Sequence, residues 1–112
     1  MGHRIEKINE LIKQQISEII PRELNLKPGI FLTVAKVDTT KDLRYTRIFI
    51  SIFPEKETNY VLKTLKKEIH FLQGKLNKKL AIKIMPRIEF TVDLTELKAD
   101  KVEKILRDID RG

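Results

Sequence analysis

The sequence contains no cysteine and no tryptophan, and its 112 residues include only two histidines, four glycines and four prolines. The lack of cysteine excludes a disulfide-stapled scaffold, a cysteine-based zinc site and a cysteine nucleophile. The two histidines, His3 and His70, are too few for a histidine-rich metal site, so neither a metal nor another cofactor is expected. The glycines stand far apart, which excludes a glycine-rich phosphate-binding loop.

Long hydrophobic runs are also missing, because no apolar stretch approaches the roughly 18 residues that a membrane-spanning helix needs. Charges begin at Arg4, so the apolar core of a signal peptide is absent, and a cytoplasmic protein with no membrane partner is expected. His70 is the one plausible general base, and Asp93 and Glu96 are explained more simply as capping residues. The sequence therefore predicts a protein that is not an enzyme and has no small-molecule substrate.

Basic charge is abundant: Lys and Arg number 23 against 16 Asp and Glu, a net charge of +7. The whole surplus lies in residues 63–87, where eight basic residues face one acidic residue, Glu68. Such a surplus indicates a polyanionic partner, nucleic acid before membrane, with a merely solubilising face as the alternative. The candidate RNA-binding residues of this basic set, with the adjacent histidine, are Lys63, Lys66, Lys67, His70, Lys75, Lys78, Lys79, Lys83 and Arg87.

Apolar periodicity predicts four helical or partly helical segments and three strands in the order α-β-β-α-α-β-α. A short polar connection between the first two strands favours an antiparallel hairpin. The expected segments are a helix over Arg4–Ile20 ended or kinked by Pro21, strands over Ile30–Val37 and Tyr45–Phe53, a helical stretch over Thr58–Leu80, a strand over Ile82–Val92, and a helix opened by a capping box at Asp100.

Phe71 conflicts with a single continuous helix over Thr58–Leu80. At 100° per residue its side chain lies opposite Leu62 and the rest of the apolar stripe. Gly74 weakens the helix interior by about 1 kcal/mol relative to alanine. Either Phe71 is exposed, or the helix breaks near residues 68–71 and turns Phe71 inward; the second arrangement is favoured.

Two further features concern the strands. Pro86 cannot donate a hydrogen bond to a ladder, so it should lie at an edge or a bulge, with Ile84 on the apolar face of the third strand. Tyr45, Arg47 and Phe49 share one face of the second strand in a pattern that could stack bases. The alternative for Phe49 is packing beneath a helix or loop. Arg44, Tyr45 and Arg47 are the secondary RNA-binding candidates.

The chain resembles the ribosome-binding factor A family, bacterial assembly factors of the small ribosomal subunit. The similarity runs from about Arg4 to Ile109, and its marks agree in order and spacing. They are the opening Arg4-Ile5, the stretch Leu32-Thr33-Val34 through Val37, Thr40-Lys41-Asp42-Leu43, Arg47-Ile48-Phe49-Ile50-Ser51, Leu76 with Leu80, and Ile84-x-Pro86-x-Ile88-x-Phe90-x-x-Asp93. Two positions depart from the family pattern. Glu68-Ile69-His70 replaces an Ala-x-Gly, and Thr46 replaces a small alanine.

The resemblance implies an α+β fold with one type II KH-like domain over residues 1–112, its core at about 4–93 and an additional C-terminal helix at about 100–110. It further implies a non-catalytic, monomeric factor that binds the immature small (30S) ribosomal subunit and its rRNA and assists 16S rRNA 5′-end processing. Two alternatives stay open. One is a general KH-type single-stranded RNA-binding protein or RNA chaperone. The other is a protein-interaction module that uses the Phe49 face and responds little to salt.

Overall fold

The computed structural model describes residues 2–95 and 99–111. In these residues the chain forms α1 (Gly2–Glu23), β1 (Phe31–Thr39), β2 (Tyr45–Phe53), a 3₁₀ turn η1 (Glu55–Glu57), α2 (Thr58–Lys67), α3 (Ile69–Lys79), β3 (Arg87–Val92) and α4 (Ala99–Arg111). The expected α+β class is therefore confirmed, and the order of elements is compatible with a type II KH-like arrangement.

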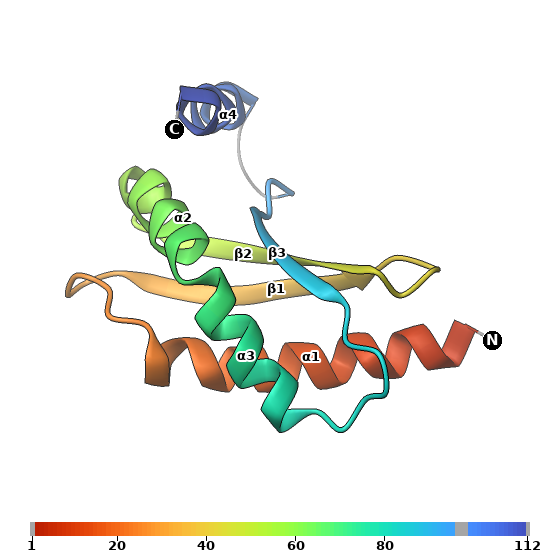
Figure 1. The fold of residues 1–112 in the computed structure, drawn as a ribbon. Helices are drawn as coiled ribbons and strands as arrows, with labels where there is room; N and C mark the ends of the chain where they lie inside the picture. Colours follow the sequence, from red (N-terminus) through yellow and green to blue (C-terminus); the bar gives the residue numbers. More distant parts are fainter. Residues whose placement is uncertain (1, 96–98, 112) are drawn as a thin grey trace.

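The three strands form one sheet in the order β1-β2-β3. β1 and β2 pair antiparallel, which confirms the predicted hairpin, and β3 pairs parallel to β2 at the edge of the sheet. Figure 1 shows α3 packed beside α1, α2 leading into α3, and α4 beyond α2 at the end of the molecule away from α1. The core lies between the sheet and the helices α1, α2 and α3. Its fully buried side chains include Ile12, Ile16, Ile48, Ile50, Leu65, Leu72, Leu76 and Ile88.

An irregularity in β1 keeps two charged residues out of the core. Strict alternation from Leu32 and Val34 would point Lys36 and Asp38 inward. The pairing with β2 shifts between Val34 and Lys36, so that one residue is inserted into the strand. Beyond this bulge Val37 is 7% exposed and Lys36 lies on the outer face. The bulge therefore reconciles the sequence with a one-sided sheet.

The helical stretch breaks at Glu68, as predicted. Glu68 has φ −95° and ψ 9°, so α2 ends at Lys67 and α3 begins at Ile69. The prediction that the break turns Phe71 inward is wrong, because its side chain is 45% exposed. The Lys75 ammonium lies 5.4 Å from the centre of the Phe71 ring, while the neighbouring Leu72 fills the core position. At the surface the ring face of Phe71 therefore has a cation as its neighbour.

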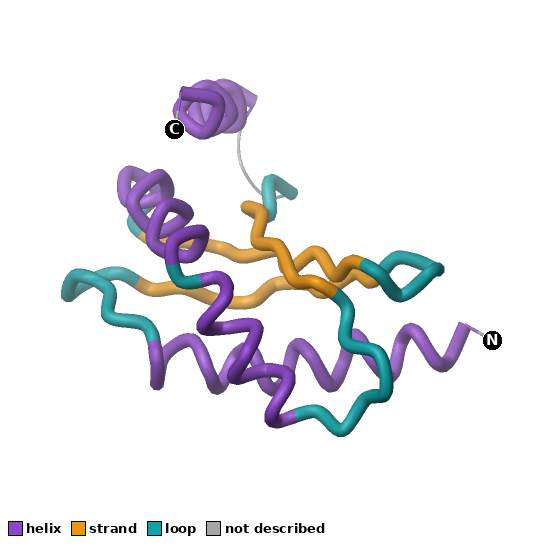
Figure 2. The backbone as a smooth tube through the Cα atoms, in the orientation of Figure 1, coloured by secondary structure: helices purple, strands orange, loops and turns teal. Residues whose placement is uncertain are grey.

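The third strand is shorter than predicted, and the expected start at Ile82 is wrong. β3 begins at Arg87, and Ile84 is 63% exposed instead of lying on the apolar face. Pro86 has no N–H to offer a ladder, so regular pairing starts only after it, with the Arg87 amide donating to the Arg44 carbonyl at 2.8 Å. Residues 80–86 instead form the loop that Figure 2 shows between α3 and β3.

The two terminal helices also differ in detail from their predicted bounds. α1 continues through Pro21 to Glu23, because the residues after a proline can still donate, and the Leu24 amide bonds to the Ile20 carbonyl at 2.9 Å. α4 begins at Ala99, packs against α2 and buries Ile105. The side chain of Asp100, the expected cap, lies outside the described part of the chain. No helix among the described residues is long and apolar enough to cross a bilayer.

A buried chain of polar side chains ties α1 to the hairpin. Thr39 donates its hydroxyl to Asn9 Oδ1 at 2.5 Å, and its oxygen lies 2.8 Å from the Thr46 hydroxyl. Thr46 is completely buried. These bonds explain how a threonine is accommodated at a core position where the resembled family usually has alanine.

We expect Thr39→Val to lower the free energy of unfolding by about 1–3 kcal/mol, because it leaves the Thr46 hydroxyl buried without its partner. The double variant Thr39→Val/Thr46→Val should cost less than the sum of the two single changes, since it removes both polar groups together. Urea unfolding of all four proteins measures this coupling. Strictly additive losses would contradict it.

Candidate nucleic-acid interface

The lysines of α2 lie on the side of the helix that faces away from the core. Val61 and Leu65 are buried, and at 100° per residue Lys63 and Lys67 lie opposite them. Lys66 lies to one side of this pair and is also exposed. The amphipathic spacing of α2 therefore determines both its core contact and its basic outer surface.

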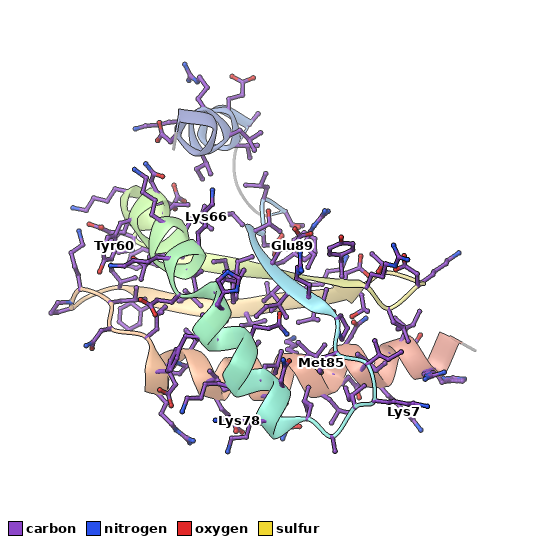
Figure 3. The ribbon with its side chains drawn as sticks, in the orientation of Figure 1. Lys7, Tyr60, Lys66, Lys78, Met85 and Glu89 are labelled. Carbon is purple, nitrogen blue, oxygen red and sulfur yellow. The ribbon has the colours of Figure 1, made fainter. Side chains whose placement is uncertain are left out.

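On α3 the basic side chains occupy the outer face and one flank. Leu72 and Leu76 are buried, Lys78 lies on the far side from them, and Lys79 is exposed at the last turn. Lys75 lies on the flank towards α1, where its ammonium is 3.7 Å from a carboxylate oxygen of Glu23. In Figure 3, Lys66 and Lys78 mark the α2 and α3 parts of this surface.

We call the exposed set of Lys63, Lys66, Lys67, Lys78, Lys79 and Lys83 the basic surface. Among the described residues, Lys75 is the only one of the eight basic residues between 63 and 87 that forms an ion pair. Lys75 is therefore the weakest candidate, because its charge is already partly balanced. The basic surface carries positive charge on two helices and on the loop that follows them.

A groove lies beside α3, with a volume of about 810 Å³. One wall is α3 and the other comes from the β1–β2 turn and the start of β3, and apolar side chains from α3 and the 80–86 loop lie between them. The groove brings together two of the predicted candidates, His70 and Arg87, with two secondary candidates, Arg44 and Tyr45. Its remaining lining residues are Asp42, Leu43, Ile69, Gln73, Asn77, Ile84, Met85, Pro86 and Ile88.

The turn at the mouth of the groove carries a stabilised negative charge. The Asp42 carboxylate accepts hydrogen bonds from the Thr40 hydroxyl at 2.6 Å and from the Arg44 amide at 3.1 Å. The Thr40 bond, followed by the amide bond, lowers the pKa of Asp42 below its ordinary value. The carboxylate also lies 3.9 Å from the Arg44 guanidinium, so the positive charge of Arg44 is partly balanced.

The structure separates Arg47 from the other secondary candidates. Arg47 lies on the open face of the sheet between Asp38 on β1 and Glu89 on β3, and its guanidinium is 3.5 Å from Glu89. Two flanking carboxylates make this position poorly suited to a phosphate. Phe49, on the same face, is half-buried, and the Lys36 ammonium lies 5.3 Å from its ring centre.

Sequence reasoning missed two amides in the groove, Gln73 and Asn77. Gln73 accepts a hydrogen bond from the Ile88 amide at 2.8 Å and donates to the Pro86 carbonyl at 3.2 Å. It also donates to Asn77 Oδ1 at 2.9 Å. The sequence does contain a sign of this role. Gln73 lies one helical turn from both Ile69 and Leu76, so it is a polar residue at the edge of the apolar stripe of α3.

The described residues contain no group of three or more histidine, aspartate or glutamate side chains that could hold a metal ion. Asp93 accepts hydrogen bonds from the Thr95 hydroxyl and amide, which lower its pKa. Its observed role is thus local, as a turn residue. Glu96, considered with it from the sequence, lies outside the described residues.

These features define a small basic α+β protein with a broken helix alongside a parallel edge strand. The chain belongs to the ribosome-binding factor A family, because the family model described as Ribosome-binding factor A matches residues 4–106. Similar relatives carry that description. One from Natranaerobius thermophilus is 35% identical, over 99% of this chain and 86% of its own length. One from Dictyoglomus thermophilum is 33% identical, over 97% of this chain and 92% of its own length.

Solved structures agree with this assignment at the level of the fold. The crystal structure of ribosome-binding factor A from Thermus thermophilus superposes with a TM-score of 0.69 at 23% identity, covering 79% of this chain and 94% of that one. A homology model of the Thermus thermophilus factor has been fitted into a cryo-electron microscopy map of its complex with the 30S subunit. It superposes with a TM-score of 0.65 at 25% identity, covering 78% of this chain and 92% of that one.

Proposed function

We propose that this chain is a non-catalytic ribosome assembly factor that binds the immature 30S subunit in the cytoplasm and assists 16S rRNA 5′-end processing. The observation that carries the proposal is the basic surface, whose ammonium groups point outward from α2, α3 and the following loop. Such groups neutralise phosphates without reading sequence, which suits a folded rRNA surface. The Thermus thermophilus factor, in the same family, has been fitted into a 30S complex, which supports the same partner here.

The chain is proposed to act as one monomeric domain, with α4 as an accessory helix. Among the described residues, the core cluster of the sheet, α1, α2 and α3 contains no side chain of α4, which contacts α2 instead. We assign binding of rRNA to the basic surface on α2, α3 and the following loop.

Co-sedimentation with ribosomal particles tests the proposed function. We expect the protein to sediment with immature 30S subunits at low salt, to bind complete ribosomes less, and to be released as salt rises. A cell that lacks the protein should accumulate 16S rRNA with an unprocessed 5′ end. Equal binding to subunits and complete ribosomes, independent of salt, would contradict the proposal.

The groove supports a second candidate, a general single-stranded RNA-binding protein or RNA chaperone. Tyr45 is 45% exposed at the groove, and a tyrosine there can stack on an unpaired base. Competition separates the two candidates. Unstructured RNA at equal nucleotide concentration should displace a general RNA binder from subunits, and should leave an assembly factor bound to them.

A further inference from the structure

Phe71 is an aromatic side chain on the outer side of α3 that contributes little to the core. It is 45% exposed, while the adjacent Leu72 is completely buried. At 3.6 residues per turn, Phe71 lies roughly 160° around the helix from Gln73, which lines the groove. The Phe71 ring therefore faces away from both the core and the groove.

Gly74 leaves the helix surface bare beside this ring. It lies one helical turn after Phe71, and a glycine weakens a helix interior relative to alanine. Packing does not require a glycine here, because a Cβ at this position would meet no atom within 4 Å. Its backbone is helical, so no unusual dihedral angle requires one either. A glycine in such a place lets a ligand approach the backbone closely.

The exposed charge around the ring is mainly positive. The Lys75 ammonium lies 5.4 Å from the ring centre and 3.7 Å from a carboxylate oxygen of Glu23, so it is held beside the ring. Lys78 lies two turns after Phe71 on the same side of α3 and is exposed. Glu68, one turn before Phe71, is half-buried. The free charge next to the ring is therefore the ammonium group of Lys78.

An exposed aromatic ring beside cations has the chemistry of a stacking site for a nucleobase. Every base offers a π face, and cations near the ring neutralise the phosphates of the same strand. The contact with Lys75, which Glu23 also holds, restrains the Phe71 ring before any ligand arrives. A restrained side chain loses less conformational entropy on binding.

We propose that Phe71 is a stacking platform for one unpaired base of ribosomal RNA on the outer side of α3, with Lys78 holding a phosphate of the same strand. The inference rests on the proposed function as an rRNA-binding factor and adds a base contact to the phosphate contacts of the basic surface. The platform does not involve the groove. Because stacking tolerates every base, it recognises an unstacked nucleotide and not a sequence.

A single tryptophan can report stacking at this position, because the chain contains none. We expect the fluorescence of Phe71→Trp to be quenched by an RNA hexamer of adenine and by 30S subunits, since stacking on a base quenches indole emission. A hexamer of abasic ribose phosphates should bind the lysines without quenching. Phe53→Trp is the matched control, because Phe53 is a 66% exposed aromatic on β2, outside the basic surface and the groove.

Three outcomes of this titration would overturn the platform. The first is the absence of quenching of Phe71→Trp by both the adenine hexamer and the 30S subunits. The second is equal quenching by the abasic hexamer, and the third is equal quenching of Phe53→Trp.

Substitution by alanine provides the second measurement. We expect Phe71→Ala to bind the adenine hexamer about 5- to 150-fold less tightly, the loss typical of one base–aromatic stack. No phosphate contact is removed, so the slope of log K against log salt should stay the same. Phe53→Ala should keep the full affinity. Undiminished binding by Phe71→Ala, or a loss accompanied by a smaller salt slope, would contradict stacking. The fluorescence titration decides the question if Phe71→Ala does not fold.

Failure of the platform and failure of the proposed function give different results. Co-sedimentation of the unsubstituted chain with 30S subunits, without quenching of Phe71→Trp, removes the platform and leaves the assembly factor. Quenching by the adenine hexamer without subunit binding keeps the platform and favours the general RNA binder. A blue shift of Phe71→Trp emission on subunits, without quenching by the hexamer, would place the ring against a ribosomal protein and overturn the RNA contact.

Discussion

Replacing Lys78 and Lys79 by glutamate is expected to weaken binding to 30S subunits about 25- to 60-fold at 0.1 M salt. Each phosphate contact contributes roughly 0.7–0.9 to the slope of log K against log salt. Losing two contacts therefore lowers that slope by about 1.4–1.8. Because 0.1 M salt lies one log unit below 1 M, the affinity at 0.1 M falls by about 1.4–1.8 log units, which is about 25- to 60-fold. Both lysines are exposed near the end of α3, so the fold should remain intact. Sedimentation over a salt series measures affinity and slope together.

The matched control reverses two exposed lysines elsewhere, Lys13 on α1 and Lys56 in η1. It changes the net charge by the same amount, so it separates a local contact from a general loss of positive charge. We expect it to change the affinity by a few-fold and to leave the salt slope nearly unaltered. Equal losses in the two variants would mean that net charge alone, and not the basic surface, brings the protein to the subunit.

The second large effect concerns stability. Leu72 is completely buried on α3, and Leu72→Ala is expected to lower the free energy of unfolding by about 2–5 kcal/mol through lost apolar burial and a new cavity. That is a large part of the roughly 5–15 kcal/mol typical of small domains. Urea unfolding with a constant m-value measures the change.

Phe71 is the control for this prediction, because it is the adjacent residue on the same helix. Its side chain is 45% exposed, so Phe71→Ala should cost about 1 kcal/mol or less. If Phe71→Ala proved the more destabilising change, the break at Glu68 would rotate α3 differently in solution. The pair of variants thus tests the helix break as well as the core.

Several features could be predicted because they depend on residues close together in the chain. The hairpin follows from alternation on both sides of a short polar turn. The break near residues 68–71 is predicted at the right place, but its predicted effect, an inward Phe71, is wrong, because Phe71 is 45% exposed. The concentration of charge between residues 63 and 87 is a property of composition alone. Amphipathic spacing places Lys63, Lys67 and Lys78 opposite the core, so the outward direction of these three also follows from local periodicity.

Other features depend on neighbours that are distant in the sequence. In the sequence, Arg47 has no acidic residue close enough to balance its charge. The pairing of β2 with β1 and β3 places Asp38 and Glu89 beside it. Lys75 has no acidic residue near it in the sequence other than Glu68, and only the packing of α3 on α1 brings Glu23 to it. A cross-strand or interhelical partner is fixed by the assembled sheet and helices, and no spacing rule within one segment identifies it.

Sequence by itself determined the order of elements, the hairpin and the concentration of basic charge, because periodicity and charge act over a few residues. Tertiary structure alone decided which cations stay unbalanced, how β1 keeps Lys36 and Asp38 out of the core, and which groups line the groove. The bulge at Val34 and the contact of Gln73 with β3 are clear cases. Each satisfies a charge or a backbone group whose surroundings exist only when strands and helices have packed together.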